Sequence, residues 1–175
     1  MKYYPLFSLI ALLIILSIVY RTIKNGISPM PSSKKAIQAI LALIPEGQRR
    51  IYELGSGWGT LALSLAKRHP KSTVVGIENS PIPYAVSRLI QHGTRLPNLL
   101  FKKADFFQTP LDDAQVIVCY LYPGAMEKLK RKFEKELQPG TCVISNTFAV
   151  PGWKPVKVIE LPDLYRTKVY LYILS

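Results

Sequence analysis

The chain has 175 residues, and 49% of them are hydrophobic, which is enough for one compact domain with a short appendage but not for two full domains. Lysine and arginine number 23 against 11 aspartate and glutamate, and the net charge of +12 suits nucleic acid, anionic lipid or solubility alone. Because Cys119 and Cys142 each lie in an apolar β-like run, we expect buried thiols in a reducing compartment, no disulfide framework and no metal site.

An uncharged apolar run, YYPLFSLIALLIILSIVY, covers residues 3–20, and a helix needs about 17–25 such residues to cross a bilayer. We therefore predict a membrane-spanning anchor helix over residues 1–24; a cleaved signal peptide, a buried core helix and a helix lying in the membrane interface are the alternatives. The first 35 residues carry five basic residues and no acid, which favours a membrane surface over nucleic acid. The positive-inside tendency predicts a single-pass protein with its C-terminal domain in the cytoplasm.

A linker is expected at residues 25–32, where glycine, serine and two prolines occur together. The remaining residues, 33–175, are expected to form the domain. Its first element is predicted to be an amphipathic helix that is capped by Ser33 and ends at Pro45 and Gly47.

From residue 50 onward, β-rich apolar runs alternate with helical patterns, and this alternation predicts a parallel sheet with crossover helices. Strands are expected at residues 50–56, 72–80, 99–105, 114–121 and 141–148, and helices at 60–68, 82–92 and 125–137. Two last apolar runs, 154–161 and 168–174, have no helical pattern between them and predict an antiparallel hairpin. The expected fold is α/β, a Rossmann-like, seven-stranded, mostly parallel sheet with an antiparallel C-terminal hairpin and helices on both faces, preceded by one transmembrane helix.

The chemically informative stretch is Glu53-Leu54-Gly55-Ser56-Gly57-Trp58-Gly59, between the first strand and a helix. Its glycines do not fit the dinucleotide loop G-x-G-x-x-G, because position 60 is threonine, and no G-K-[ST] follows as a phosphate loop would require. An acid two positions before G-x-G-x-G resembles the first motif of class I S-adenosylmethionine (SAM)-dependent methyltransferases. A carboxylate suits a ligand that carries a sulfonium and an ammonium.

This resemblance extends from about residue 37 to the C-terminus and implies SAM as the cofactor. The next strand ends at Glu78-Asn79, where an acid can accept both ribose hydroxyls. The third ends at Asp105-Phe106, which resembles the family position where an acid accepts from the adenine amino group beside an apolar cover. The predicted cofactor-binding residues are Glu53, Gly55, Ser56, Gly57, Gly59, Glu78, Asn79, Asp105 and Phe106, and each acid taken alone is also compatible with a helix cap.

The fourth strand ends in Tyr120-Leu121-Tyr122-Pro123, where amino-methylating members of the superfamily often carry [N/D]-P-P-[Y/F]. The absence of that motif argues against an adenine, cytosine or glutamine-amide acceptor. An aromatic-proline turn can instead hold a lysine amine, because tyrosine faces attract cationic nitrogen. Tyr120, Tyr122 and Pro123 are therefore the candidate catalytic residues, which position the acceptor.

The segment SNTFAVPGWKP at residues 145–155, with the anchor and the short domain, resembles a small group of membrane-associated protein-lysine methyltransferases. Their eukaryotic members act on the mitochondrial adenine nucleotide translocase and the c-ring protein of ATP synthase. Within this segment, Phe148 and Trp153 are compatible with core packing or with an acceptor-pocket wall.

The resemblance implies methylation of lysine side chains in a membrane or membrane-associated protein, with lipid contacted through the anchor and nucleic acid disfavoured as a partner. The alternatives are a methyltransferase for a membrane-soluble quinone or lipid, and a catalytically inactive SAM-binding regulator. The sequence leaves the oligomeric state open.

Overall fold

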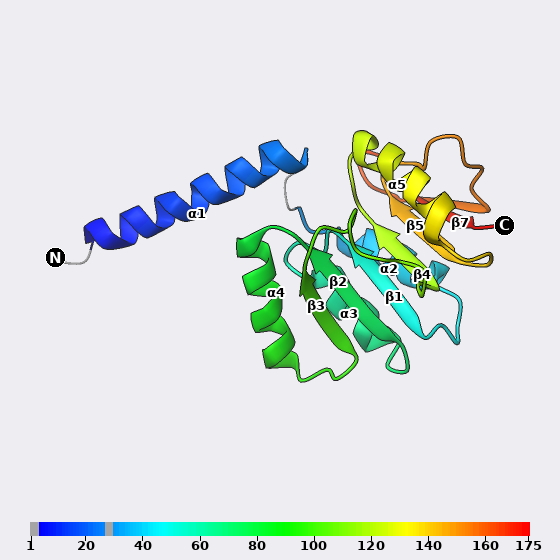
Figure 1. Cartoon of the computed structure of the whole chain (residues 1–175), viewed down its shortest axis with the longest axis horizontal. Helices are drawn as coiled ribbons and strands as arrows, with labels where there is room; N and C mark the ends of the chain where they lie inside the picture. The colour runs from blue at the N-terminus through cyan, green and yellow to red at the C-terminus, as the bar shows by residue number, and fades with distance from the viewer. Residues whose placement is uncertain (1–3, 27–29) are drawn as a thin grey trace.

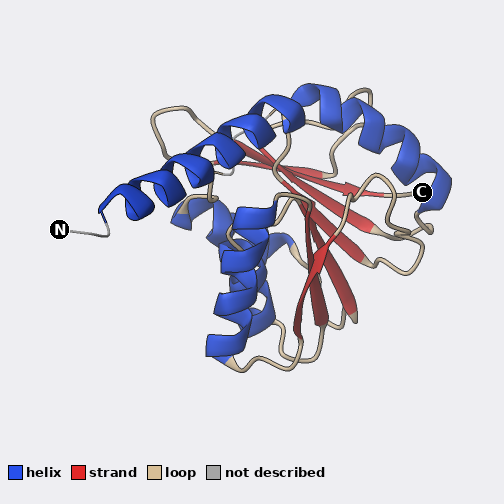
Figure 2. Ribbon diagram, turned by 60° about the vertical axis from the view of Figure 1, so that its left-hand side comes forward, coloured by secondary structure: helices blue, strands red, loops and turns tan. Residues whose placement is uncertain are grey.

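Seven strands form one mixed sheet in the computed structural model, which describes residues 4–26 and 30–175. The strand order across the sheet is β3-β2-β1-β4-β5-β7-β6 (Figures 1 and 2). The strands are β1 (Arg50–Leu54), β2 (Thr73–Glu78), β3 (Leu99–Lys103), β4 (Val116–Cys119), β5 (Cys142–Asn146), β6 (Lys157–Glu160) and β7 (Lys168–Ile173).

The first five strands are parallel to one another, whereas β7 is antiparallel to both β5 and β6. The predicted Rossmann-like sheet with an antiparallel C-terminal hairpin is therefore confirmed. The second hairpin strand, β7, inserts between β5 and β6, which leaves β6 at the edge of the sheet. Because the order reverses between β1 and β4, the carboxyl ends of these strands open at the topological switch point where α/β sheets bind ligands.

Alternate residues of β1, β2, β4, β5 and β7 supply two separate cores, so helices cover both faces of the sheet (Figure 2). Ile51 of β1 faces the core that contains α2 (Lys34–Leu43) and α3 (Thr60–Arg68), against which Tyr84 of α4 (Pro81–Thr94) also packs. Tyr52, the next residue of β1, faces the core of α5 (Pro123–Glu136), where Met126 and Phe133 are fully buried.

Local signals place the helix ends. Ser33 caps α2 as predicted, with its side chain accepting a 3.2 Å hydrogen bond from the amide of Ala36. Helices α4 and α5 begin earlier than predicted, at Pro81 and Pro123. Proline is favoured in the first turn because its missing N–H has no helical partner there.

The apolar run near the N-terminus forms one helix, α1 (Tyr4–Asn25), as expected. Within residues 4–26 and 30–175, however, no helix meets the length and hydropathy needed to cross a membrane, so the prediction of a transmembrane helix is wrong for the described chain. The last turns of α1 lie against the domain, where Ser17, Ile18 and Thr22 line a cavity.

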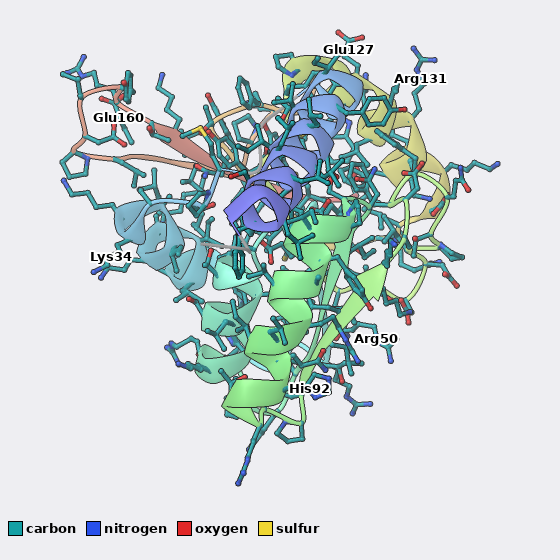
Figure 3. All side chains as sticks on the ribbon, turned by 90° about the vertical axis from the view of Figure 1, so that its left-hand side faces the viewer. Lys34, Arg50, His92, Glu127, Arg131 and Glu160 are labelled. Carbon is teal, nitrogen blue, oxygen red and sulfur yellow. The ribbon has the colours of Figure 1, made fainter. Side chains whose placement is uncertain are left out.

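Two pieces of the predicted anchor and linker, residues 1–3 and 27–29, lie outside the described residues. The C-terminal end of α1 approaches the carboxyl ends of the parallel strands, and the helix packs against α4. Its N-terminal end projects away from the domain (Figure 1). Figure 3 shows α1 nearly end-on, between α4 and α5.

Candidate active site

One cavity lies at the carboxyl ends of the parallel strands and is lined by residues from five connections of the chain. Four of these connections follow β1, β2, β3 and β4, and the fifth is the N-terminal segment. The cavity brings together most of the site residues predicted from the sequence: Glu53, Gly55, Ser56, Gly57, Glu78, Asn79, Asp105, Phe106, Tyr120 and Tyr122.

The glycine loop turns sharply away from β1 and is attached to β2. Gly55, Gly57 and Gly59 have φ values of 73°, 52° and 82°, a region that side chains with a β-carbon rarely occupy. The amides of Gly55 and Ser56 both donate to the carbonyl of Ile77, at 2.9 and 3.0 Å. A β-carbon at Gly57 would meet nothing within 4 Å, so the backbone there is open to a ligand.

Gly59 has a different position from the one predicted, because it does not line the cavity. It is the N-cap of α3, and a β-carbon at this position would lie 2.6 Å from the Phe101 ring. Its role in the described structure is therefore to close the turn and to let the ring of Phe101 pack beneath the loop.

Glu53 lies at the end of β1 with a buried carboxyl group. Burial raises its pKa well above the usual carboxyl value, the Ala62 amide opposes this by donating a hydrogen bond, and the charge of Glu78 raises the pKa further. The Oε2 atom of Glu53 and the hydroxyl of Ser56 are both buried without a hydrogen-bond partner in the described part of the chain. Two such atoms beside one cavity suit a polar ligand that supplies the missing partners.

Glu78 joins the loop after β1 to the start of α4. Its Oε2 accepts from the amide of Gly57 at 2.9 Å, and its Oε1 accepts from the amide of Ser80 at 2.7 Å. Each carboxylate oxygen has a second lone pair, so these bonds leave acceptor capacity toward the cavity. The hydroxyl of Ser80 also donates to Oδ1 of Asn79 at 3.2 Å, and this bond holds the side chain of Asn79, which lines the cavity as well.

Asp105 and Phe106 form the wall contributed by the turn after β3. Oδ1 of Asp105 accepts from the amide of Phe107 at 2.9 Å, which closes a turn rather than capping a helix, since the described chain has no helix between β3 and β4. The ring of Phe106 is nearly buried and lies 4.5 Å from that of Phe107 between centroids, and it also lines the cavity. Phe106 therefore joins the core to the wall of the site.

Aromatic rings dominate the wall that follows β4. Tyr120 and Phe148 are nearly parallel, with ring centroids 6.3 Å apart and an interplanar angle of 16°. Tyr122 lines the cavity beside them. Pro123 is the first residue of α5 and is exposed outside the cavity lining, next to Tyr122, so its place beside the acceptor stays a prediction.

Among the lining residues that sequence reasoning missed are two groups with different origins. The first group comes shortly after Glu78 in the chain, so its closeness to a predicted site residue could have indicated it: Ser80, Pro81, Ile82 and Pro83. The second group comes from α1 and the linker and has no local signal, because only the tertiary fold brings it to the site: Ser17, Ile18, Thr22, Met30, Pro31 and Ser32.

The residues present fit a ligand that is cationic and rich in hydroxyl groups. Glu53 supplies a buried carboxyl, Glu78 and Asp105 supply further acceptors, and the loop amides approach without side chains between them. A nucleotide pyrophosphate would be repelled by the carboxylates of Glu78 and Asp105, whereas SAM carries positive charge. Fold and cavity together define a class I SAM-dependent methyltransferase.

Comparisons with known proteins agree with this class. A family profile described as "ANTKMT methyltransferase domain" matches residues 53–157, and the chain belongs to that family. It is 32% identical to a protein-lysine N-methyltransferase of Saccharolobus islandicus over 83% of this chain and 92% of that protein. It is 27% identical to the mouse adenine nucleotide translocase lysine N-methyltransferase, over 73% of this chain and 56% of that one.

Among solved structures, an RNA methyltransferase from Salinibacter ruber in complex with S-adenosyl-L-homocysteine superposes with a TM-score of 0.75. Its sequence is 29% identical, and the match covers 83% of this chain and 94% of that one. The chain is therefore a SAM-dependent methyltransferase, and SAM is its cofactor.

Proposed function

We propose that this enzyme transfers the methyl group of SAM to lysine side chains of a protein that lies in or against a membrane. The observation that carries the proposal is the aromatic wall after β4, where Tyr120 and Tyr122 face the same cavity as the carboxyl groups that suit SAM. The Saccharolobus relative is a protein-lysine N-methyltransferase, and its match extends over most of both chains.

The residues of the cavity have separate roles in this proposal. Bound SAM would supply an electrophilic methyl group on a sulfonium. Glu53, Glu78, Asp105 and the glycine loop would hold the cofactor, and the rings of Tyr120 and Tyr122 would orient the acceptor nitrogen. The nitrogen must arrive neutral, which a partly apolar pocket favours by disfavouring its charged form, and the methylated amine then releases its proton to water.

A transfer assay tests the acceptor. The purified chain is incubated with methyl-labelled SAM and a membrane extract, and protein, RNA and lipid fractions are separated. We expect label in protein, and peptide mass spectrometry should locate it on lysine. Label confined to RNA would favour the activity named for the Salinibacter neighbour, and label confined to lipid or quinone, or SAM binding without turnover, would contradict the proposal.

The membrane part of the proposal is supported by α1, which exposes an unusual number of large apolar side chains. The exposed fraction is 68% at Phe7 and 57% at Leu13, although side chains of this kind are usually buried. We propose that residues 1–24 attach the enzyme to the cytoplasmic side of a membrane without crossing it, that residues 25–32 link them to the domain, and that residues 33–175 form the catalytic domain. The mouse relatives in the comparison are named for two substrates, the adenine nucleotide translocase and the c-ring protein of ATP synthase.

Vesicle flotation tests this attachment. The full chain should float with vesicles of phosphatidylcholine and phosphatidylglycerol, and the triple variant Leu9→Glu, Leu13→Glu, Leu16→Glu should not, because charges on the exposed helix oppose contact with hydrocarbon. Leu164→Glu is the matched control, since Leu164 is 90% exposed but lies outside α1. Equal flotation of all three proteins would contradict attachment through α1.

A further inference from the structure

The acceptor side of the cavity is built partly by the N-terminal segment. Ser17, Ile18 and Thr22 of α1 line the same cavity as Tyr120 and Tyr122. Met30, Pro31 and Ser32, which follow the helix, also line it. The segment that exposes apolar side chains to the outside therefore also forms one wall of the site on the inside.

A direct contact joins this segment to the aromatic wall. A β-carbon at Gly26 would lie 2.8 Å from both Cε1 and Cζ of the Tyr122 ring, closer than a real β-carbon comes to another side chain. Gly26 has a φ of 71° and comes directly after α1, as glycine commonly does at the end of a helix. The ring of Tyr122 thus packs on the bare backbone where α1 ends.

A second glycine limits the ring from the side of α5. A β-carbon at Gly124 would lie 2.9 Å from Cε2 of Tyr122, an atom that a β-carbon at Gly26 would also approach, at 3.0 Å. The backbone of Tyr122 is fixed as well, because its carbonyl accepts hydrogen bonds from the amides of Ala125 and Met126. With the backbone held by α5, the two glycines decide where the phenol ring can lie.

We propose that Gly26 is a positioning residue for methyl transfer, and that the end of α1 completes the acceptor channel by seating the Tyr122 ring against the side chain of the incoming lysine. This inference rests on the proposed lysine activity. It implies that the acceptor passes between the last turns of α1 and the Tyr120–Phe148 pair, so that a substrate in contact with α1 already lies beside the channel.

The test compares Gly26→Ala with Gly47→Ala in the full chain. Gly47 also has a left-handed φ, of 82°, but a β-carbon there meets nothing within 4 Å, so this variant reproduces the backbone strain without the collision. With the labelled membrane extract as the acceptor, Gly26→Ala should lower the initial rate of protein methylation at least tenfold while the Kd for SAM stays within twofold of the wild type. Gly47→Ala should leave both values within twofold.

Tyr122→Ala provides the coupling control. If Gly26 acts through the ring, the double variant Gly26→Ala, Tyr122→Ala should methylate protein at the rate of Tyr122→Ala alone, within twofold. If Gly26→Ala does not fold, Gly124→Ala replaces it, because it reaches the same ring from within a helix, where alanine is favourable.

Three results would overturn the inference: equal rates for the Gly26 and Gly47 variants, a parallel loss of SAM affinity, or additive losses in the double variant. These outcomes are distinct from failure of the proposed function, in which the wild type itself would yield no methyl-lysine. In that case Gly26 would have no lysine channel to complete, and the inference would fall with the function.

Discussion

The carboxylate of Glu78 and the amide of Gly57 are joined by a 2.9 Å hydrogen bond, although 21 positions separate them in the chain. This bond fixes the glycine loop after β1 to the end of β2. The other oxygen of Glu78 accepts from the amide of Ser80, so one side chain organises two walls of the cavity. Such charge-assisted bonds are stronger than neutral ones and hold a site in shape before its ligand binds.

Replacement of Glu78 by glutamine should weaken SAM binding about 10- to 100-fold, since each lost hydrogen bond to a charged group is worth roughly 1.5–3 kcal/mol. A glutamine oxygen can accept from only one of the two amides, and its NH₂ group faces the other. Calorimetric titration of SAM measures the effect. Glu127→Gln on the exposed, outward face of α5 (Figure 3) is the control, and an equal loss there would contradict this role of Glu78.

The raised pKa of Glu53 predicts a pH dependence of stability. The folded chain keeps the Glu53 proton at pH values above 4.5, where the unfolded chain has lost it, so the folded state binds more protons in that window. The contribution of this group to the free energy of unfolding should therefore fall as pH rises from 4.5 and level off once the folded carboxyl ionises. Glu53→Gln should flatten that slope in denaturant titrations of the SAM-free protein, and an unchanged slope would contradict the assignment.

The same proton links pH to SAM binding. A cationic ligand favours the ionised form of Glu53, so the wild type should bind SAM more tightly as pH rises through the raised pKa, by at most about tenfold per pH unit. Binding should also release a proton, which calorimetry in buffers of different ionisation enthalpy detects. Glu53→Gln should bind weakly and without proton release, and release that persists in this variant would assign the proton to another group.

One oxygen of Asp105 accepts the turn hydrogen bond from Phe107, and the residue also lines the cavity. Asp105→Asn can keep the accepted bond from Phe107 but presents an NH₂ group where an adenine amino group also donates. We expect SAM affinity to fall about tenfold or more with little change in melting temperature, whereas Asp105→Ala should lower both because the turn hydrogen bond to Phe107 is lost as well. Equal affinities of the wild type and Asp105→Asn would remove this residue from the cofactor site.

Thr147 holds a strained turn between β5 and Phe148. Its φ is 69°, and the amide of Phe148 donates across it to the carbonyl of Asn146 at 2.8 Å. Such conformations cost a β-branched residue of order 1–3 kcal/mol, so Thr147→Gly should raise the free energy of unfolding by about 1 kcal/mol after the backbone entropy of glycine is deducted.

The rate of protein methylation by the Thr147→Gly variant should fall at the same time, because the turn places the ring of Phe148 against that of Tyr120. Thr167→Gly is the control for stability: Thr167 is not among the residues with positive φ, and this variant should lose about 0.5–1 kcal/mol. Destabilisation of both variants in urea titrations would show that the turn is not strained.

Much of the cofactor side was predictable because each of its signals is local. The alternation of apolar runs and helical patterns indicated the parallel strands, and Glu53, Glu78 and Asp105 each stand at or just after the end of one. Parallel strands bring their carboxyl ends to one edge of the sheet, so residues far apart in the chain meet there as a consequence of strand pairing alone. The glycines of the loop likewise indicated a backbone that residues with a β-carbon avoid.

The acceptor side depended on contacts that no local pattern encodes. Phe148 meets Tyr120 only because β5 pairs with β4, and Gly26 meets Tyr122 only because α1 ends over the cavity. The sequence by itself determined the sheet, the glycine loop and the acids that suit SAM, because these follow from periodicity and strand ends. Tertiary packing alone decided that the last turns of the apolar helix lie on the domain and line its cavity, because that choice depends on which surfaces bury one another.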